Sequence, residues 1–201
     1  MDGKVFVQFT GFLLLWSVSL EPTQARLFTL NTPGTSSACI MVDITFKAEV
    51  QALRGGTVVS TKYLTSDDKQ ITTTGVCRSG STEIVLEFGG KTIWYIAFQQ
   101  REHEPTEPVG QYRGLQFVPS QLFNQTTSIS KQLNFFDPRP VYQTDIKDSF
   151  FCPTKDQTRY MSTHSPNEDA SFNVDVTVFS IHSQGFDIKN NQFGPKETCS
   201  N

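Results

Sequence analysis

Apolar and polar side chains alternate along several segments of this chain. The clearest case is residues 40–50, where every second residue from Ile40 is apolar and polar residues such as Asp43 and Lys47 lie between. Successive side chains of a β-strand point to opposite faces, so this pattern predicts a strand with one buried face and one wet face.

The same alternation recurs in both halves of the chain. Residues 84–88 and 92–98 carry it on either side of Gly89-Gly90, a glycine pair that favours a tight hairpin turn because glycine tolerates positive φ. Residues 172–178 alternate in the second half. Shorter strand candidates are residues 57–64, 116–118, 132–136 and 150–152.

Beyond the first 25 residues, no window of helical length shows apolar residues at three-four spacing. Polar or proline-containing stretches at residues 101–111, 137–140 and 154–169 are predicted to be loops. We therefore expect an all-β fold, an antiparallel β-prism or sandwich-like single domain around one core.

The N-terminus has the pattern of a secretory signal peptide. Lys4 precedes an apolar stretch at residues 5–18, and small residues at Thr23 and Ala25 form a cleavage signal. The alternative, a membrane anchor, is disfavoured because polar residues interrupt a run already shorter than the roughly 20 residues that span a bilayer. We expect residues 1–25 to be removed and residues 26–201 to form the domain, without a membrane anchor.

Four cysteines lie in the predicted exported part: Cys39, Cys77, Cys152 and Cys199. Thiols in an oxidising compartment normally pair, and four cysteines allow three connectivities that sequence alone cannot separate. Sequential pairing is favoured because each cysteine lies beside a strand candidate and each pair would close one half of the chain. A zinc site is disfavoured because no Cys-x-x-Cys or Cys-x-x-His spacing occurs.

Charge and motifs argue against nucleic acid and against catalysis. The formal net charge is −3 and no basic cluster occurs, so we expect no nucleic-acid partner. No Gly-x-Ser-x-Gly elbow is present, and Thr163-His164-Ser165 has the composition of a polar loop. We expect no catalytic residues and no cofactor.

Three further candidates for metal or proton chemistry have simpler interpretations. Glu102-His103-Glu104 is expected to be a solvated loop, because adjacent residues of an extended segment point in different directions. Asp67-Asp68 resembles a turn, since no further acidic residues follow at calcium-loop spacing. His182 is expected to be a hydrogen-bonded structural histidine. We therefore expect no metal site.

One N-glycosylation sequon occurs, Asn124-Gln125-Thr126. It lies in a polar stretch of a chain that is predicted to be exported. We expect a glycan on Asn124.

Together, the cysteines and the motifs around them resemble the luminal domain of the lysosome-associated membrane glycoproteins. The matching features are Cys39 opening a strand, Gly75-Val76-Cys77, Leu86-x-Phe88, Trp94-x-Ile96-x-Phe98, Phe151-Cys152, Gln184-Gly185-Phe186 and residues 193–199 (FGPKETC). The last is the most specific, and the resemblance covers about residues 38–199.

The resemblance implies a β-prism-like fold with two sequential disulfide loops. It also implies a non-enzymatic glycoprotein of the endosomal and lysosomal lumen with a structural or protein-interaction role. The expected partners are other luminal or membrane proteins, including a second copy of the chain.

The aromatic content leaves a second hypothesis open. The chain has 17 Phe residues, which would fill a core but could also line a slot for a sterol or acyl chain. The alternative function is therefore a secreted β-module that binds a hydrophobic ligand, such as a sterol or lipid, or a glycan.

Overall fold

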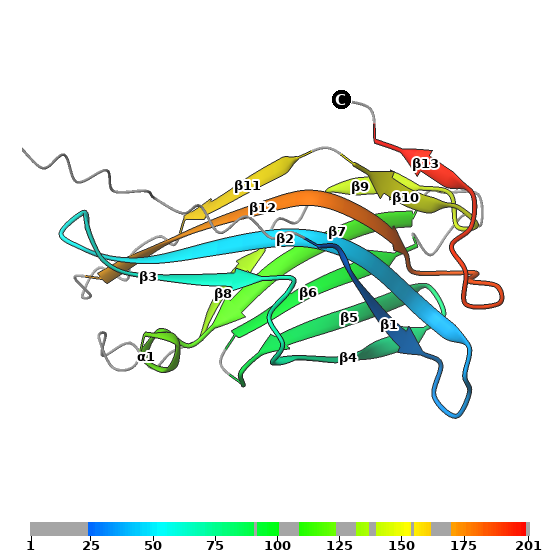
Figure 1. Ribbon diagram of the computed structural model, residues 1–201, viewed down its shortest axis with the longest axis horizontal. Helices are drawn as coiled ribbons and strands as arrows, with labels where there is room; N and C mark the ends of the chain where they lie inside the picture. The colour runs from blue at the N-terminus through cyan, green and yellow to red at the C-terminus, as the bar shows by residue number, and fades with distance from the viewer. Residues whose placement is uncertain are drawn as a thin grey trace, which may run out of the picture.

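The computed structural model describes residues 24–90, 92–100, 109–123, 132–136, 140–153, 155–161 and 170–199. These residues form two β-sheets packed face to face, with the strands of the second sheet running obliquely beneath those of the first (Figure 1). The all-β prediction is confirmed. The expected signal peptide lies almost wholly outside the described residues, as do the sequon at Asn124, Glu102-His103-Glu104 and the loop with His164.

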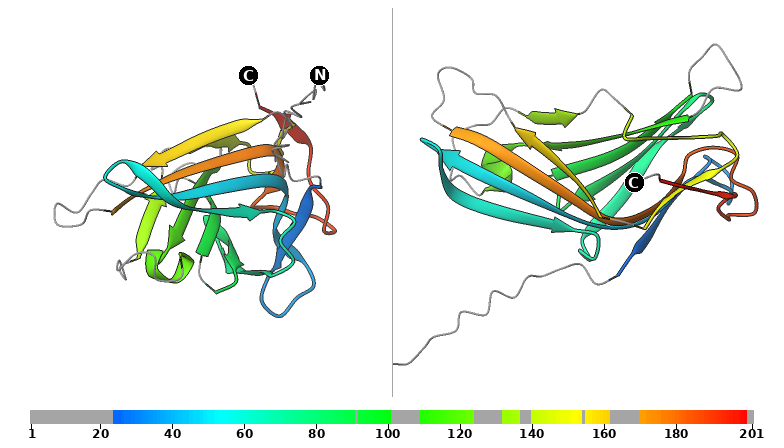
Figure 2. Two further views of the ribbon diagram at one scale, coloured as in Figure 1. Left: turned by 60° about the vertical axis from the view of Figure 1, so that its left-hand side comes forward. Right: turned by 90° about the horizontal axis from the view of Figure 1, so that it is seen from above.

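The first sheet is built on two long antiparallel strands, β2 (Ala38–Arg54) and β12 (Ala170–Gln184). Both run most of the length of the domain (Figure 2). Each is flanked on its other edge by two shorter strands. These are β1 (Arg26–Asn31) and β3 (Thr57–Thr65) on β2, and β10 (Ser149–Cys152) and β11 (Asp156–Met161) on β12; β13 (Lys196–Thr198) adds to β10.

A β-bulge in β12 explains where its alternating pattern stops. Val178 pairs with Phe46 and Ser180 with Thr45, so Phe179 is an extra residue. Before the bulge the even-numbered valines face the core, and after it Ile181 and Ser183 do. One inserted residue inverts the phase of a strand, so His182 points outward.

The second sheet is a meander whose central strands follow one another in sequence. Its order is β4 (Ile71–Arg78), β5 (Ser81–Phe88), β6 (Thr92–Gln99), β7 (Val109–Phe117) and β8 (Leu133–Phe136), with β9 (Tyr142–Thr144) also paired to β7. Gly89 and Gly90 follow β5 with φ of 55° and 70°, as the hairpin prediction requires. A single turn of helix, α1 (Pro119–Leu122), follows β7.

Aromatic rings from both sheets meet in the core. Phe46 of β2 lies 4.0 Å, centroid to centroid, from Trp94 of β6. Phe117 of β7 lies 5.8 Å from Phe172 of β12 in an edge-on arrangement. Fully burying such side chains stabilises the fold by roughly 1.5 to 3 kcal/mol each.

Both sequential disulfides are present, and they differ in what they join. Cys39 of β2 pairs with Cys77 of β4, so this bond links one sheet to the other. Cys152 of β10 pairs with Cys199, just after β13, and the Cys199 N–H donates to the Phe151 carbonyl at 3.1 Å. The second disulfide therefore holds the C-terminal strand within the first sheet.

Two of the loop predictions need correction. Residues 109–111, expected in a loop, begin β7, and Gln111 is only 2% exposed because it faces the other sheet. Residues 156–161, also expected in a loop, form β11 against β12. The described strands pair antiparallel as predicted, apart from β13, which pairs with β10 in parallel. In the described ranges no helix is long and apolar enough to cross a bilayer.

Candidate functional site

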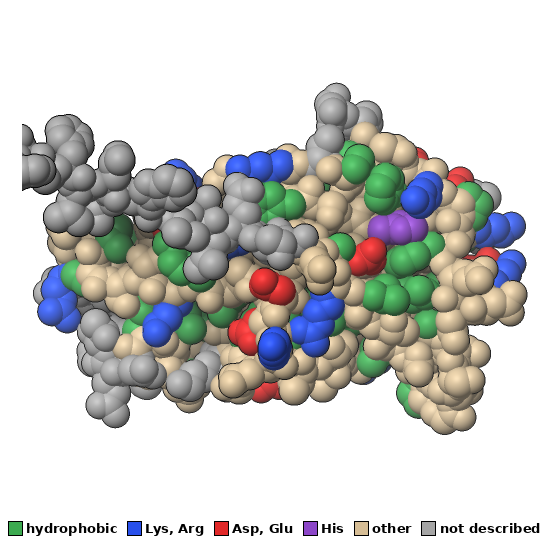
Figure 3. Space-filling model, in the orientation of Figure 1, with side chains coloured by type: hydrophobic (Ala, Val, Ile, Leu, Met, Phe, Trp, Pro, Cys, Tyr) green, Lys and Arg blue, Asp and Glu red, His purple; other side chains and the backbone are tan. Residues whose placement is uncertain are grey.

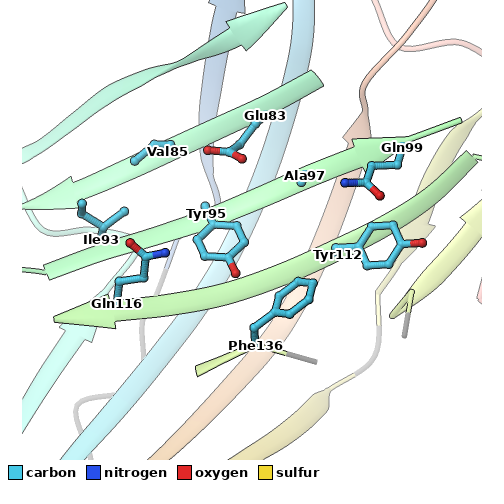
Figure 4. Close-up of a pocket in the computed structure, with 9 residues that line it drawn as sticks. All are labelled: Glu83, Val85, Ile93, Tyr95, Ala97, Gln99, Tyr112, Gln116 and Phe136. Carbon is cyan, nitrogen blue, oxygen red and sulfur yellow. The ribbon is translucent and has the colours of Figure 1, made fainter. Parts of the chain in front are cut away.

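Aromatic side chains gather on the outer face of the second sheet. On β6 the inward positions hold Trp94, Ile96 and Phe98, so Tyr95 must point outward. Tyr112 of β7 and Phe136 of β8 share that face (Figure 4). Phe136 is 48% exposed, an unusual position for a large apolar ring.

The three rings form one continuous series, here called the aromatic row: Tyr95, Phe136 and Tyr112. Phe136 lies between the tyrosines, with ring centroids 6.2 Å from Tyr95 and 6.3 Å from Tyr112, and with 28° between planes in each pair. These separations are too long for face-to-face stacking, so the rings are offset. The row crosses three neighbouring strands.

Gly114 leaves room for the Tyr95 ring. It pairs across the ladder with Tyr95 on one side and Phe136 on the other. A β-carbon at position 114 would overlap the Tyr95 ring. The absent side chain therefore lets the ring lie down against the sheet instead of standing away from it.

The aromatic row borders a shallow depression with a volume of about 420 Å³. Val85, Ile93 and Ala97 supply apolar lining, and Glu83, Gln99 and Gln116 supply polar groups. We call this surface, together with the aromatic row, the aromatic face. Its described lining residues include one carboxylate and no lysine, arginine or histidine.

The tyrosine hydroxyl near Glu83 stays protonated. Partial burial raises the pKa of Tyr95 above its ordinary value, and the Glu83 carboxylate raises it further. At neutral and at mildly acidic pH the phenol can both donate and accept a hydrogen bond.

A second polar cluster lies between the sheets, around Arg113 of β7. Its side chain is 4% exposed, with Nη1 3.6 Å from Asp156 Oδ2 and the guanidinium carbon 4.7 Å from the centre of the Tyr142 ring. Tyr142 donates its hydroxyl to the same carboxylate at 2.9 Å. Arg113 Nε and Nη2 meet no hydrogen-bond acceptor among the described residues. Burial raises the pKa of Tyr142.

His182 lies on the outer face of the first sheet, among hydrophobic side chains (Figure 3). Its ring stacks on Phe193 at 3.7 Å between centroids, and Nε2 lies 2.8 Å from Ser149 Oγ. Burial, and then the charge of Lys196, lower the pKa of His182 to about 4. His182 is thus a hydrogen-bonded histidine, as expected for a structural role.

The Ser149–His182 pair is not arranged as a nucleophile and its base. Ser149 is 0% exposed, so no substrate can reach its hydroxyl. That hydroxyl lies within hydrogen-bond distance of the Gly194 and Pro195 carbonyls, at 3.0 and 3.1 Å. It therefore holds the C-terminal loop to β10.

The C-terminal motif has a structural role. Gln184, 2% exposed, donates its amide to the Phe186 and Lys147 carbonyls and accepts the Gly194 N–H at 2.7 Å. A β-carbon at Gly185 would overlap the Phe98 ring. These residues close the end of the domain.

The remaining predicted residues are not brought into a site. Asp68 forms a local turn, accepting the Gln70 N–H at 2.8 Å through its carboxylate. Within the described ranges, no three His, Cys, Asp or Glu side chains are grouped as metal ligands. The sequence analysis did not predict the aromatic face, although one signal for it was present. Tyr95 lies between Trp94 and Ile96, at a position where the alternation predicts a polar, outward-facing residue.

Comparison with known proteins gives a structural answer only. No protein-family model matches the sequence, and no curated protein matches it. Among solved structures, human lysosome-associated membrane protein 3 aligns with a TM-score of 0.63 and 18% identity, covering 88% of this chain and 99% of that one.

Two mouse domains align similarly over 88% of this chain. The membrane-proximal domain of lysosome-associated membrane protein 1 gives a TM-score of 0.61 with 14% identity, covering 98% of that chain. The membrane-distal domain of lysosome-associated membrane protein 2 gives 0.61 with 15% identity, covering 99% of that chain. The chain therefore has the fold of the lysosome-associated membrane protein luminal domain, as its cysteines and motifs predicted.

Proposed function

We propose that this chain is a non-enzymatic interaction domain of the endosomal and lysosomal lumen, which binds other luminal or membrane proteins through its aromatic face. The observation that carries the proposal is the half-exposed Phe136 between two tyrosines on the outer face of the second sheet. Exposed aromatic rings rimmed by polar groups are typical of binding surfaces.

The fold and the disulfides support the proposed compartment. Three solved structures with this fold are named as lysosome-associated membrane proteins. Two disulfides are typical of a chain that matures in the oxidising secretory pathway. In this proposal residues 1–25 direct export and Asn124 carries a glycan.

The experiment combines imaging with proximity labelling in cells that express the tagged full chain. We expect overlap with an endosomal or lysosomal marker, and a set of labelled luminal proteins that shrinks in the Phe136→Ala variant. Tyr63→Ala is the matched control, because Tyr63 is a 56% exposed aromatic residue on the first sheet. An unchanged set in Phe136→Ala, or the same loss in Tyr63→Ala, would contradict the proposal.

The Arg113 cluster favours a second candidate function, binding of a lipid between the sheets. Arg113 Nε and Nη2 could receive an acidic headgroup, because they lack acceptors among the described residues. Mass spectrometry of lipids extracted from the purified chain tests this. A fatty acid that copurifies with the wild type and is lost from Arg113→Met would support it, and a lipid-free wild type would contradict it.

A further inference from the structure

We propose that the aromatic face is a carbohydrate-binding site, which takes the neutral glycans of partner glycoproteins. The inference rests on the proposed function in one respect, that this face is the binding surface. It adds the chemical class of the ligand.

The aromatic row suits the apolar side of a sugar ring. One face of a pyranose exposes several C–H groups, and these pack well against the electron-rich face of an aromatic ring. Because Phe136 and both tyrosines are offset from one another, the row is longer than one ring. It can therefore contact consecutive sugars of an oligosaccharide.

The polar groups of the face suit hydroxyls, which donate and accept hydrogen bonds at the same atom. The amides of Gln99 and Gln116 and the tyrosine hydroxyls have the same dual character. Gln132 Nε2 donates to Gln116 Oε1 at 2.9 Å, which orients the Gln116 amide and leaves its NH₂ group to donate. Glu83 adds an acceptor.

Charge and shape disfavour the other ligand classes. Among the described residues that line the depression there is one carboxylate and no cationic side chain, which disfavours phosphate, sulfate and sialic acid. An acyl chain would leave the polar groups of the open depression without partners. An extended peptide binds most readily at a free strand edge, whereas this surface is the face of paired strands.

The binding surface is held in place before any ligand arrives. Its residues lie on β5, β6, β7 and β8, hydrogen-bonded neighbours within one sheet, and Gly114 fixes where the Tyr95 ring lies. Rings on a rigid sheet lose little conformational entropy on binding.

The test is a glycan array probed with the secreted full chain, followed by calorimetry with the best oligosaccharide. We expect binding to neutral oligosaccharides, and weaker binding to the sialylated form of each. Phe136→Ala should bind about fivefold more weakly, since one aromatic contact is worth about 1 kcal/mol. Tyr63→Ala should bind as the wild type does.

Two further variants still test the inference if Phe136→Ala folds poorly. Tyr112→Phe removes only a hydroxyl and should weaken binding less. Glu83→Gln should narrow the difference between neutral and sialylated ligands. No binding to any neutral glycan, or binding unaffected by Phe136→Ala and Tyr112→Phe together, would overturn the inference.

A glycosidase-treated partner separates this inference from the proposed function. Binding that depends on Phe136 and disappears with the partner's glycans supports both. Binding that depends on Phe136 and survives glycan removal overturns the carbohydrate inference alone. Binding that does not depend on Phe136 overturns both the proposed function and the carbohydrate inference.

Discussion

Tyr95 and Gly114 face each other across the β6–β7 ladder, and the tyrosine ring occupies the space that a side chain at position 114 would fill. An aromatic ring that covers a cross-strand glycine gains packing surface and shields a stretch of backbone that would otherwise be bare. The pair therefore links the stability of the second sheet to the shape of the aromatic face.

Gly114→Ala should lift the Tyr95 ring from the sheet and weaken ligand binding, with a stability cost of about 1 to 3 kcal/mol from overpacking. Thermal unfolding and binding are measured on Gly114→Ala, Tyr95→Ala and the double variant. In the Tyr95→Ala background the new methyl group meets no ring, so we expect Gly114→Ala to cost much less there. Additive losses would contradict a direct clash between the two residues.

The sequence predicted the strands that have one buried face better than it predicted the strands at the sheet edges. Alternation located β2, β5, β6 and most of β12 because one face of each is buried against the other sheet. It missed β4, whose residues 71–78 are mostly polar or small because the strand lies at a sheet edge. It also missed the phase change after Val178, because a bulge is set by pairing with β2.

The aromatic face was missed for a related reason. Tyr112 and Phe136 lie far apart in the sequence and lie on one face only because β8 returns to pair with β7. For the cysteines, by contrast, the strand-flanked loops favoured sequential pairing and the family resemblance implied it, although spacing alone allowed three connectivities.

The stability of the domain should fall as pH drops from about 6.5 to 4. The ordinary pKa of histidine is 6.5, and that of His182 is lowered to about 4 by burial and by Lys196. Between these values the unfolded chain binds the proton that the folded chain excludes, so stability is highest above this window and is lost as pH falls through it. Because the imidazole is partly exposed, we expect about 1 kcal/mol.

His182→Gln should flatten that dependence. Glutamine does not titrate, and its amide can keep a hydrogen bond to Ser149. Urea unfolding at pH 6.5 and pH 5 is compared between the variant and the wild type, a range in which most carboxylates stay ionised. Parallel losses in both proteins would show that a group other than His182 controls the pH response.

Removing each of the two disulfides should destabilise a different part of the domain. Cys39→Ala/Cys77→Ala unlinks the two sheets and should cost about 2 to 4 kcal/mol, with faster hydrogen exchange in both β1 and β4. Cys152→Ala/Cys199→Ala releases β13, whose residues are exposed and which pairs only with β10 among the described strands. Its extra exchange should stay within the C-terminal segment. Identical exchange patterns in the two variants would contradict this division.

Removing Arg113 and removing Asp156 should have unequal effects on the stability of the fold. Asp156→Asn leaves a buried guanidinium without its counter-charge, and we expect a loss of about 1 to 3 kcal/mol, moderated because the carboxylate is 34% exposed. Arg113→Met replaces the cation with an apolar chain beside the Tyr142 ring and should cost less than Asp156→Asn. The double variant should recover most of the loss.

Urea unfolding at pH 7 measures all three variants, with the m-value as a check that the unfolded state is unchanged. Tyr142→Phe is the matched control, because it removes one hydrogen bond to Asp156 and keeps the ring under Arg113. A larger loss in Arg113→Met than in Asp156→Asn would mean that the guanidinium itself stabilises the fold. In that case the Arg113 donors must meet acceptors when the chain is folded in solution, and the second candidate function loses its support.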